Sequence, residues 1–138
     1  MSLLLDTTVV SELRKAAKGQ AHPRFARWAA SASLDTSFVS VITMMELEAG
    51  ILRRQRHDPA QAGVFRAWFD VIADAFADRI LDVDLRVARR AAALNTPDPA
   101  PYADSLIGAT ALVHGLAVAT RNSVDFDRFG VDLVDPWR

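Results

Sequence analysis

The amino-acid sequence predicts an α/β domain with a mainly parallel central sheet and helices on both of its faces. Short apolar runs with strand character alternate with longer segments whose apolar residues recur at helical spacing. The segment "TPDPAPY" (96–102) is the clearest break in this alternation, because its three prolines forbid regular structure. Right-handed crossovers between parallel strands place the carboxyl ends of the strands at one edge of the sheet, where open α/β sheets keep their sites.

Residues 3–5 form a short apolar run typical of a buried strand, and the apolar positions between residues 9 and 17 recur at helical spacing. Pro23 and Pro59 stand where the first turn of a helix tolerates proline. In chain order, we expect a strand at 3–5, helices at 8–17 and 21–32, a strand at 36–40, and helices at 41–54 and 58–77.

The second half of the chain continues the alternation on either side of the proline-rich break. "RILDVD" and "LAVAT" have strand character, whereas "LRVARRAAALN" is typical of a helix. We expect a strand at 79–84, helices at 85–95 and 103–115, a strand at 116–120, a turn at 121–126 and a last strand at 131–134. These patterns leave the order of the strands in the sheet open.

Composition and charge narrow the classes of protein to which the chain can belong. Its 138 residues have the size of one domain (1–138), and 51% hydrophobic with 24% charged residues suits a globular protein. A formal net charge of −1 gives no general affinity for polyanions, so contact with nucleic acid requires a local basic patch. The absence of cysteine excludes disulfides, thiol nucleophiles and Cys-ligated metals. No signal peptide or membrane span is indicated, and a cytoplasmic location is expected.

Four carboxylates stand out against this predicted fold. Asp6 follows the first strand, Glu46 lies in the helix at 41–54, and Asp104 begins the helix after the proline break. Asp125 lies just beyond the strand "LAVAT". Convergence at one sheet edge would create an oxygen-rich cluster, which suits Mg²⁺ or Mn²⁺ because hard cations prefer carboxylate and water oxygens. Such a metal can activate water and stabilise charge on a phosphodiester.

Each of these acids also has an explanation that requires no ligand. Asp6 precedes a helical pattern and could be its N-cap, although Thr8 and Glu12 do not form a clean capping box. Asp104 in a first helical turn would interact favourably with the helix dipole, and Asp125 could cap a turn. Both interpretations remain open on spacing alone.

A helical wheel places Glu46 at the border of the apolar face of its helix. Val41, Met45 and Leu52 define the centre of that face, and a carboxylate at its edge is what a pocket-lining residue would look like. Glu48 falls nearer the middle of the apolar arc. The wheel therefore does not choose between the two glutamates.

Basic residues gather at the ends of two helices. Arg53, Arg54, Arg56 and His57 end one of them, and Arg14, Lys15 and Lys18 end the other. A solvated helix C-terminus explains such residues without a ligand, whereas phosphate contact is the alternative, with Arg53 and Arg54 as candidates. Arg121 is nearer to the acids along the chain and is a better candidate. The aromatic residues at helical positions are expected in the core or at a partner interface: Trp28, Phe65 and Trp68.

Three stretches, "LLLDTTVVSEL", "VSVITMMELEAGI" and "YADSLIGATALVHGLAVATRNSVDFDRFGVDLVDPW", together resemble the PIN-domain family. Among its members they are most similar to the VapC-type toxins of type II bacterial toxin–antitoxin pairs and to their FitB-like relatives. The resemblance runs nearly from end to end, and its strongest part is "ATRNSVDF" after the helix that contains "ADSLIGATA".

The resemblance implies a three-layer α/β/α PIN-like fold and a metal-dependent ribonuclease. By that resemblance, the catalytic metal ligands are Asp6, Glu46, Asp104 and Asp125, while Glu48 has no counterpart. Polar support would come from Thr7, Thr120 and Asn122. The implied cofactor is Mg²⁺, with Mn²⁺ as a substitute, and the implied substrate is RNA, with tRNA as one candidate. The implied partners are a cognate VapB-type antitoxin and a second copy of the chain, with operator DNA bound only through the antitoxin.

Other functions are weighed against this one. A weakly catalytic or non-catalytic PIN subunit of a DNA-binding autoregulatory complex is the main alternative, but retention of all four acids argues against lost catalysis. An aspartyl-nucleophile phosphatase would need an acid at Thr8, so its D-x-D motif is broken. No glycine-rich turn follows any expected strand, which disfavours a dinucleotide-dependent dehydrogenase.

Overall fold

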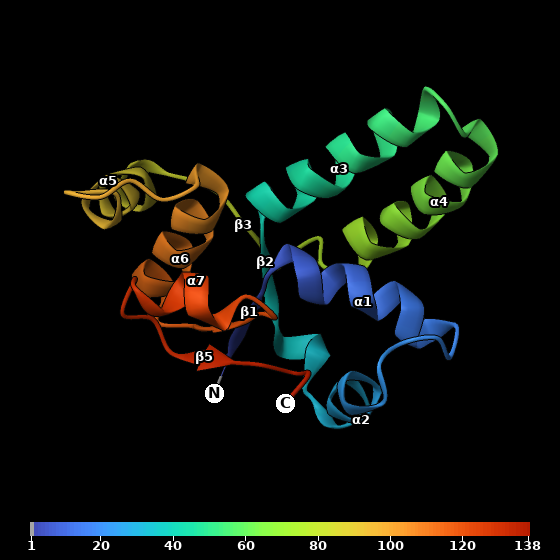
Figure 1. The fold of residues 1–138 in the computed structure, drawn as a ribbon, viewed down its shortest axis with the longest axis horizontal. Coiled ribbons are helices and arrows are strands. Elements are labelled where there is room, and N and C mark those ends of the chain that lie inside the picture. Colours follow the sequence, from blue (N-terminus) through green and yellow to red (C-terminus); the bar gives the residue numbers. More distant parts are fainter. Residues whose placement is uncertain (1) are drawn as a thin grey trace.

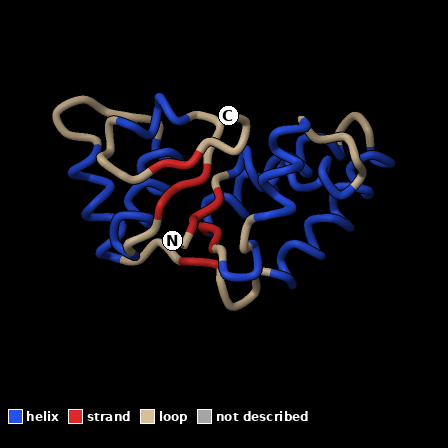
Figure 2. Tube along the Cα trace, turned by 90° about the horizontal axis from the view of Figure 1, so that it is seen from below, coloured by secondary structure: helices blue, strands red, loops and turns tan. Residues whose placement is uncertain are grey.

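The computed structural model describes residues 2–138 and contains a five-stranded sheet in the order β3-β2-β1-β4-β5. All four strand pairings are parallel. The strands lie side by side in the middle of the molecule, with helices on both sides (Figure 2). The predicted three-layer α/β/α architecture with a parallel sheet is thus confirmed, and the structure supplies the strand order that the sequence left open.

The elements follow the expected alternation closely (Figure 1). The strands are β1 (Leu3–Leu5), β2 (Phe38–Ser40), β3 (Ile80–Leu81), β4 (Ala117–Ala119) and β5 (Leu133–Val134). The helices are α1 (Thr7–Ala17), α2 (Pro23–Ser31), α3 (Val41–Gln55), α4 (Pro59–Ala75), α5 (Leu85–Leu94), α6 (Tyr102–His114) and α7 (Ser123–Asp127), with a 3₁₀ turn η1 at Leu34–Thr36. Among residues 2–138, none of the helices combines the length and apolar character needed to cross a bilayer.

Alternate residues of the two central strands build a core on each face of the sheet. Leu4 and Val118 pack with apolar residues of α6 and α7, whereas Leu5 and Ala119 pack with residues of α1 and α2. All four side chains are completely buried, as expected of strands covered by helices on both faces. These central strands consequently hold the first residues beyond their carboxyl ends in fixed positions.

The structure differs from the predicted elements at three places. Residues 121–126, expected as a turn, contain most of helix α7, because Phe126 is drawn into the core under α6. The strand expected at 79–84 is reduced to β3, since the Asp84 carboxylate accepts a hydrogen bond from the Val87 amide at 2.9 Å and starts α5. The 3₁₀ turn η1 delays the start of β2 to Phe38.

The apolar centre that the helical wheel assigned to α3 is wrong. Met45 is 58% and Leu52 52% exposed, whereas Thr43 and Ile51 are buried. Helix α3 projects beyond the sheet as one arm of a hairpin with α4 and also contacts α1 (Figure 1). Its buried stripe is therefore set by these neighbours rather than by its most apolar side chains.

The polar edge of the sheet is formed by the residues at the carboxyl ends of three neighbouring strands. Asp6 directly follows β1, Ser40 ends β2, and Thr120 directly follows β4; all three are buried. Ser40 caps α3 by accepting a hydrogen bond from the Ile42 amide at 3.0 Å. Strand ends and helix starts therefore meet at one edge, as in other open parallel sheets.

Candidate active site

Asp6 is the N-cap of α1 and also lies at the centre of the polar sheet edge. One carboxylate oxygen, Oδ1, accepts hydrogen bonds from the Val9 amide at 3.1 Å and from Thr8 Oγ1 at 2.5 Å. The other, Oδ2, accepts from Thr120 Oγ1 at 2.5 Å. The capping interpretation of Asp6 is correct, but it does not exclude a ligand role, because an ionised carboxylate offers about four lone-pair sites and three are used.

A chain of hydrogen bonds connects Asp6 to Asp125 through the turn that follows β4. Thr120 Oγ1 donates to Asp6 and accepts from the Asn122 amide at 2.9 Å. The Asn122 carbonyl in turn accepts from the Asp125 amide at 3.0 Å. These bonds fix the start of α7 against β1, so the first and last of the four acids keep a defined relation.

Glu46 is linked to the same edge through α1. Thr7 Oγ1 donates to Glu46 Oε1 at 2.5 Å, and it lies 3.2 Å from the buried Thr43 Oγ1. Since Thr7 immediately follows Asp6, this contact brings α3 against the start of α1. Glu48 lies elsewhere: it is bound by Arg66 of α4, with Arg66 Nη1 donating to Oε1 at 2.8 Å. The structure therefore separates the two glutamates that the helical wheel left undecided.

Asp104 and Asp125 face one shared pocket of about 240 Å³ between α6 and α7. Asp104 stands in the first turn of α6 and Asp125 in the first turn of α7, so a helix amino terminus supports each carboxylate. The remaining lining residues are Ala100, Pro101, Val124, Arg128 and Phe129. The pocket thus combines two carboxylates and one arginine with a few apolar side chains.

Two of the four acids have raised pKa values, for different reasons. Burial raises the pKa of Asp6, and the hydrogen bonds from Thr120 and Thr8 oppose this effect without overcoming it. Burial also raises the pKa of Asp104, and the negative charges of Asp125, Glu46 and Asp6 raise it further, in that order. The negative charges of all three other acids thus act on the Asp104 carboxylate.

The donor chemistry of this cluster suits a hard divalent cation. Its acids offer carboxylate oxygens, and the repulsion felt by Asp104 would be offset by positive charge. Within residues 2–138, however, no three carboxylate or imidazole side chains lie close enough to ligate one ion together. Mg²⁺ commonly binds through one or two carboxylates and several waters, so the pocket shared by Asp104 and Asp125 fits it without a closed set of protein ligands.

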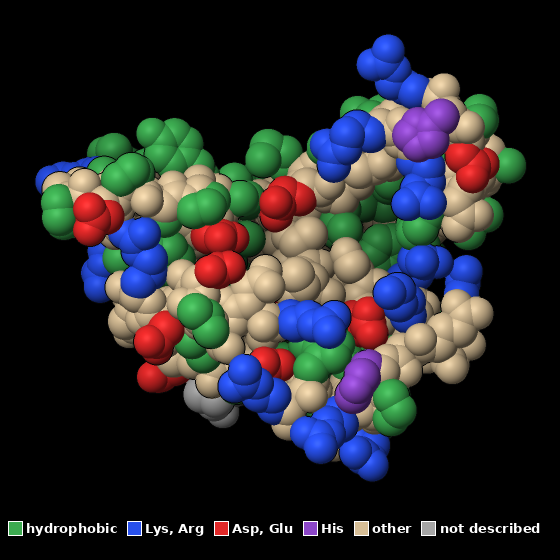
Figure 3. All heavy atoms as spheres, viewed as in Figure 1, with side chains coloured by type: hydrophobic (Ala, Val, Ile, Leu, Met, Phe, Trp, Pro, Cys, Tyr) green, Lys and Arg blue, Asp and Glu red, His purple; other side chains and the backbone are tan. Residues whose placement is uncertain are grey.

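The basic residues singled out in the sequence lie around the acids rather than among them. The guanidinium carbon of Arg121 is 5.3 Å from the centre of the Trp137 ring, while the Arg121 amide donates to Thr8 Oγ1 at 3.3 Å. Arg53 and Arg54 occupy the last turn of α3, two turns beyond Glu46. Figure 3 shows acidic side chains over the start of α3 and over α6 and α7, and basic ones over the far ends of α1, α3 and α4.

Sequence reasoning did not assign two threonines that the structure places in this network. Thr8 donates to Asp6 Oδ1, and the completely buried Thr43 lies beside the Thr7 hydroxyl that binds Glu46. A signal for Thr43 was present, because a threonine three residues before Glu46 shares its helix face. Thr8 was considered only in a capping box and as the position that breaks a D-x-D motif.

Comparison with known proteins places this site in a family. The PIN-domain model matches residues 3–131. The VapC ribonuclease Y4jK of Sinorhizobium fredii is 33% identical over 98% of this chain and 97% of its own length. The solved structure of FitAcB from Neisseria gonorrhoeae superposes with a TM-score of 0.86 at 32% identity, covering 99% of both chains. A FitAB complex bound to an IR36 DNA fragment gives the same TM-score at 30% identity, covering 99% of this chain and 96% of the other.

The matched region contains all four acids and both central strands that position Asp6 and Thr120. The relatives cover the chain almost completely, so the similarity extends over the whole of the sheet and its helices. The resemblance noted in three separate stretches of sequence is confirmed along the entire fold. The chain belongs to the PIN-domain family.

Proposed function

We propose that this protein is a metal-dependent endoribonuclease toxin, neutralised by a cognate antitoxin. The observation that carries the proposal is the raised pKa of Asp104, caused in part by the charges of Asp125, Glu46 and Asp6. An acid that is repelled by three others reduces the stability of the fold, and a bound cation would offset that cost in a catalytic site. The names of two relatives, a VapC ribonuclease and the toxin FitB, support ribonuclease and toxin activity in particular.

In this proposal the catalytic residues are Asp6, Glu46, Asp104 and Asp125, acting as ligands of Mg²⁺, for which Mn²⁺ can substitute. When bound, the metal supplies positive charge against which a phosphodiester can be hydrolysed. Thr7 holds Glu46 and Thr120 holds Asp6 through their short hydrogen bonds, so neither carboxylate is free to turn away.

The surrounding side chains have a different role in the proposal. Asn122 positions α7 through its main chain, and its exposed side chain is free to meet the substrate. Arg121, held against Trp137, and Arg53 and Arg54 at the end of α3 are candidates for RNA phosphate contacts. Such contacts orient the RNA backbone across the acids without reading its sequence, and tRNA is one candidate substrate.

The partners proposed for the chain come from its relatives. Residues 1–138 would act as one PIN domain, which forms a homodimer and binds a VapB-type antitoxin. FitAB has been solved bound to a DNA fragment, and this supports contact with operator DNA through the antitoxin. The second candidate function is that of a weakly catalytic subunit in such a DNA-bound complex. The solved FitAB–DNA structure is the observation that favours it.

The test of catalysis is incubation of the purified protein with total RNA, with and without Mg²⁺, followed by mapping of the cut ends. We expect cleavage that stops in excess chelator and in Glu46→Gln. Glu48→Gln is the matched control, because Glu48 lies on the same helix but is bound to Arg66 and faces away from the acids. Cleavage that persists in chelator, or that is lost equally in both variants, would contradict the proposal.

A further inference from the structure

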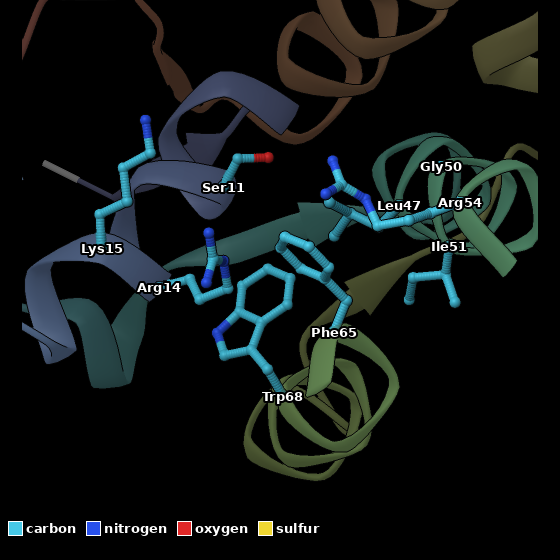
Figure 4. Close-up of a pocket in the computed structure, with 9 residues that line it drawn as sticks. All are labelled: Ser11, Arg14, Lys15, Leu47, Gly50, Ile51, Arg54, Phe65 and Trp68. Atoms are coloured by element: carbon cyan, nitrogen blue, oxygen red, sulfur yellow. The ribbon is translucent and has the colours of Figure 1, made fainter. Parts of the chain in front are cut away.

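A second pocket lies between α1, α3 and α4, away from the pair Asp104 and Asp125 (Figure 4). It encloses about 150 Å³, with Arg14 contributed by α1, Arg54 by α3 and Phe65 by α4. The residues Phe65 and Trp68, expected in the core or at an interface, line it together. None of the four acids lines this pocket, and Arg54 is the one of its residues already proposed to contact RNA.

Two arginines from opposite walls converge on one aromatic ring in this pocket. The guanidinium carbon of Arg14 lies 4.2 Å, and that of Arg54 4.5 Å, from the centre of the Phe65 ring. Over the described range 2–138, neither guanidinium is paired with a carboxylate, whereas the neighbouring Lys15 is paired with Glu12 at 3.5 Å. Two uncompensated cations held near one point attract an anion.

The pocket lies further along the same two helices, α1 and α3, that meet beside Asp6 and Glu46. The hydrogen bond between Thr7 and Glu46 joins α1 to α3, and the pocket walls Ser11 and Gly50 stand four residues further along the same two helices. At a rise of about 1.5 Å per residue this step is about 6 Å, and Arg54 follows about 12 Å beyond Glu46. A polyanion crossing the acids therefore reaches these arginines along the same pair of helices.

The remaining walls indicate more than a small free anion. Leu47, Ile51 and Trp68 give the pocket a largely apolar surface beneath the two guanidinium groups. A flat base can pack against apolar and aromatic side chains while its phosphate meets the arginines, which is the usual combination in sites for single-stranded nucleic acid. The pocket thus places cations beside an apolar wall, as a phosphate and its base require.

We propose that this pocket binds one nucleotide of a single-stranded RNA substrate, with its phosphate on Arg14 and Arg54 and its base against Trp68. The nucleotide would lie away from the acids, because Arg54 stands about 12 Å along α3 from Glu46. This inference rests on the proposed ribonuclease function and adds to it a contact away from the acids. Arg14 and Trp68 become substrate-binding residues rather than catalytic ones.

The experiment is binding of a short fluorescent single-stranded RNA, measured by anisotropy in chelator across a range of KCl concentrations. The test variant is Arg14→Ala/Arg54→Ala. The matched control is Lys18→Ala/Arg56→Ala, which removes two charges from the ends of the same two helices but outside the pocket. Poly-glutamate is the competing probe for an acidic protein segment.

We expect the test variant to lose about tenfold or more in RNA affinity, with a salt slope reduced by about 0.7 for each phosphate released, and the control to lose much less. Cleavage with Mg²⁺ should show a raised KM at nearly unchanged kcat. Equal losses in test and control, or poly-glutamate binding that depends on the pocket while RNA binding does not, would overturn the inference. If RNA binding depends on the pocket but no RNA is cut, the inference stands and the catalytic function fails.

Discussion

Asp6 shows how one side chain can serve the fold and the site together. Its Oδ1 caps α1, and its Oδ2 is held by Thr120, which follows the neighbouring strand. The sequence left open whether Asp6 is a helix cap or a metal ligand. The hydrogen bonds show that Asp6 caps α1 and still leave its carboxylate able to bind a metal. Substitution of Asp6 alone would therefore mix a lost cap, worth about 1 kcal/mol, with a lost ligand.

Asp104 allows a cleaner test, because no hydrogen bond holds the fold together through its carboxylate in the described residues. Asp104→Asn should abolish cleavage and yet raise the melting temperature in chelator by a few °C, the scale of relieving about 1 kcal/mol of repulsion. Thermal unfolding and RNA cleavage are measured on the same samples. Asp127→Asn, at the exposed end of α7, is the control and should change neither quantity. A lower melting temperature for Asp104→Asn would contradict strain among the acids.

The position of Asp104 depends on how closely helix α6 packs on the core beneath it. A Cβ added at Gly108 would lie 2.8 Å from Cδ2 of Phe129, whereas one added at Gly63 of α4 would meet nothing within 4 Å. The glycine of "IGATA" thus sets how closely α6 packs against Phe129, just beyond the end of α7, and so affects the separation of Asp104 from Asp125. The close approach is a property of the pair of elements rather than of either alone.

Gly108→Ala should therefore destabilise the protein by about 1–3 kcal/mol and reduce cleavage, since α6 must move outward. Gly63→Ala, in an exposed helical position, should instead stabilise it by about 0.5–1 kcal/mol and leave cleavage unchanged. Urea unfolding of both variants provides the free energies. Similar effects of the two substitutions would show that the contact with Phe129 does not limit α6.

At the scale of elements, the sequence predicted every helix except α7 and all five strands. The periodicity of buried strands and capped helices is local, so it can be found from neighbouring residues. Helix α7 has a single buried residue, Phe126, and is too short to show a period. The buried face of α3 could not be found either, because Thr43 and Ile51 are buried by α1 and α4, which come from other parts of the chain.

The candidate site is a property of the whole molecule, since its acids come from four elements that meet only in the folded sheet. The four residues were identified from the resemblance to a family. The negative charges of the other three acids raise the pKa of Asp104, which supports that choice. What could not be predicted is the second pocket. Arg14, Arg54 and Phe65 are separated in sequence, and their convergence depends on the angle between α1 and the α3–α4 hairpin.

Stability of the whole molecule should depend on pH through the raised pKa values of Asp6 and Asp104. A carboxyl whose folded pKa exceeds its unfolded value of 3.8 binds its proton more tightly in the folded state. Protonation of these two carboxyls therefore stabilises the fold at low pH. In chelator, the melting temperature should fall as the pH rises from 3.8 through the raised pKa values. Mg²⁺ should restore the lost stability near neutral pH and have no effect in acid. Melting curves across this range, with and without Mg²⁺, provide the measurement; a Mg²⁺ effect that persists in acid would contradict it.

The hydrogen bond between Thr120 and Asp6 joins residues 114 positions apart. The Asp6 amide also donates to the carbonyl of Ala119, the last residue of β4. During synthesis the chain emerges from its amino terminus, so β1 must wait for β4 before the middle of the sheet can close. Asp125 emerges later still. A ribosome must therefore synthesise the chain at least as far as Asp125 before the four acids can meet, and a shorter nascent chain carries no assembled site.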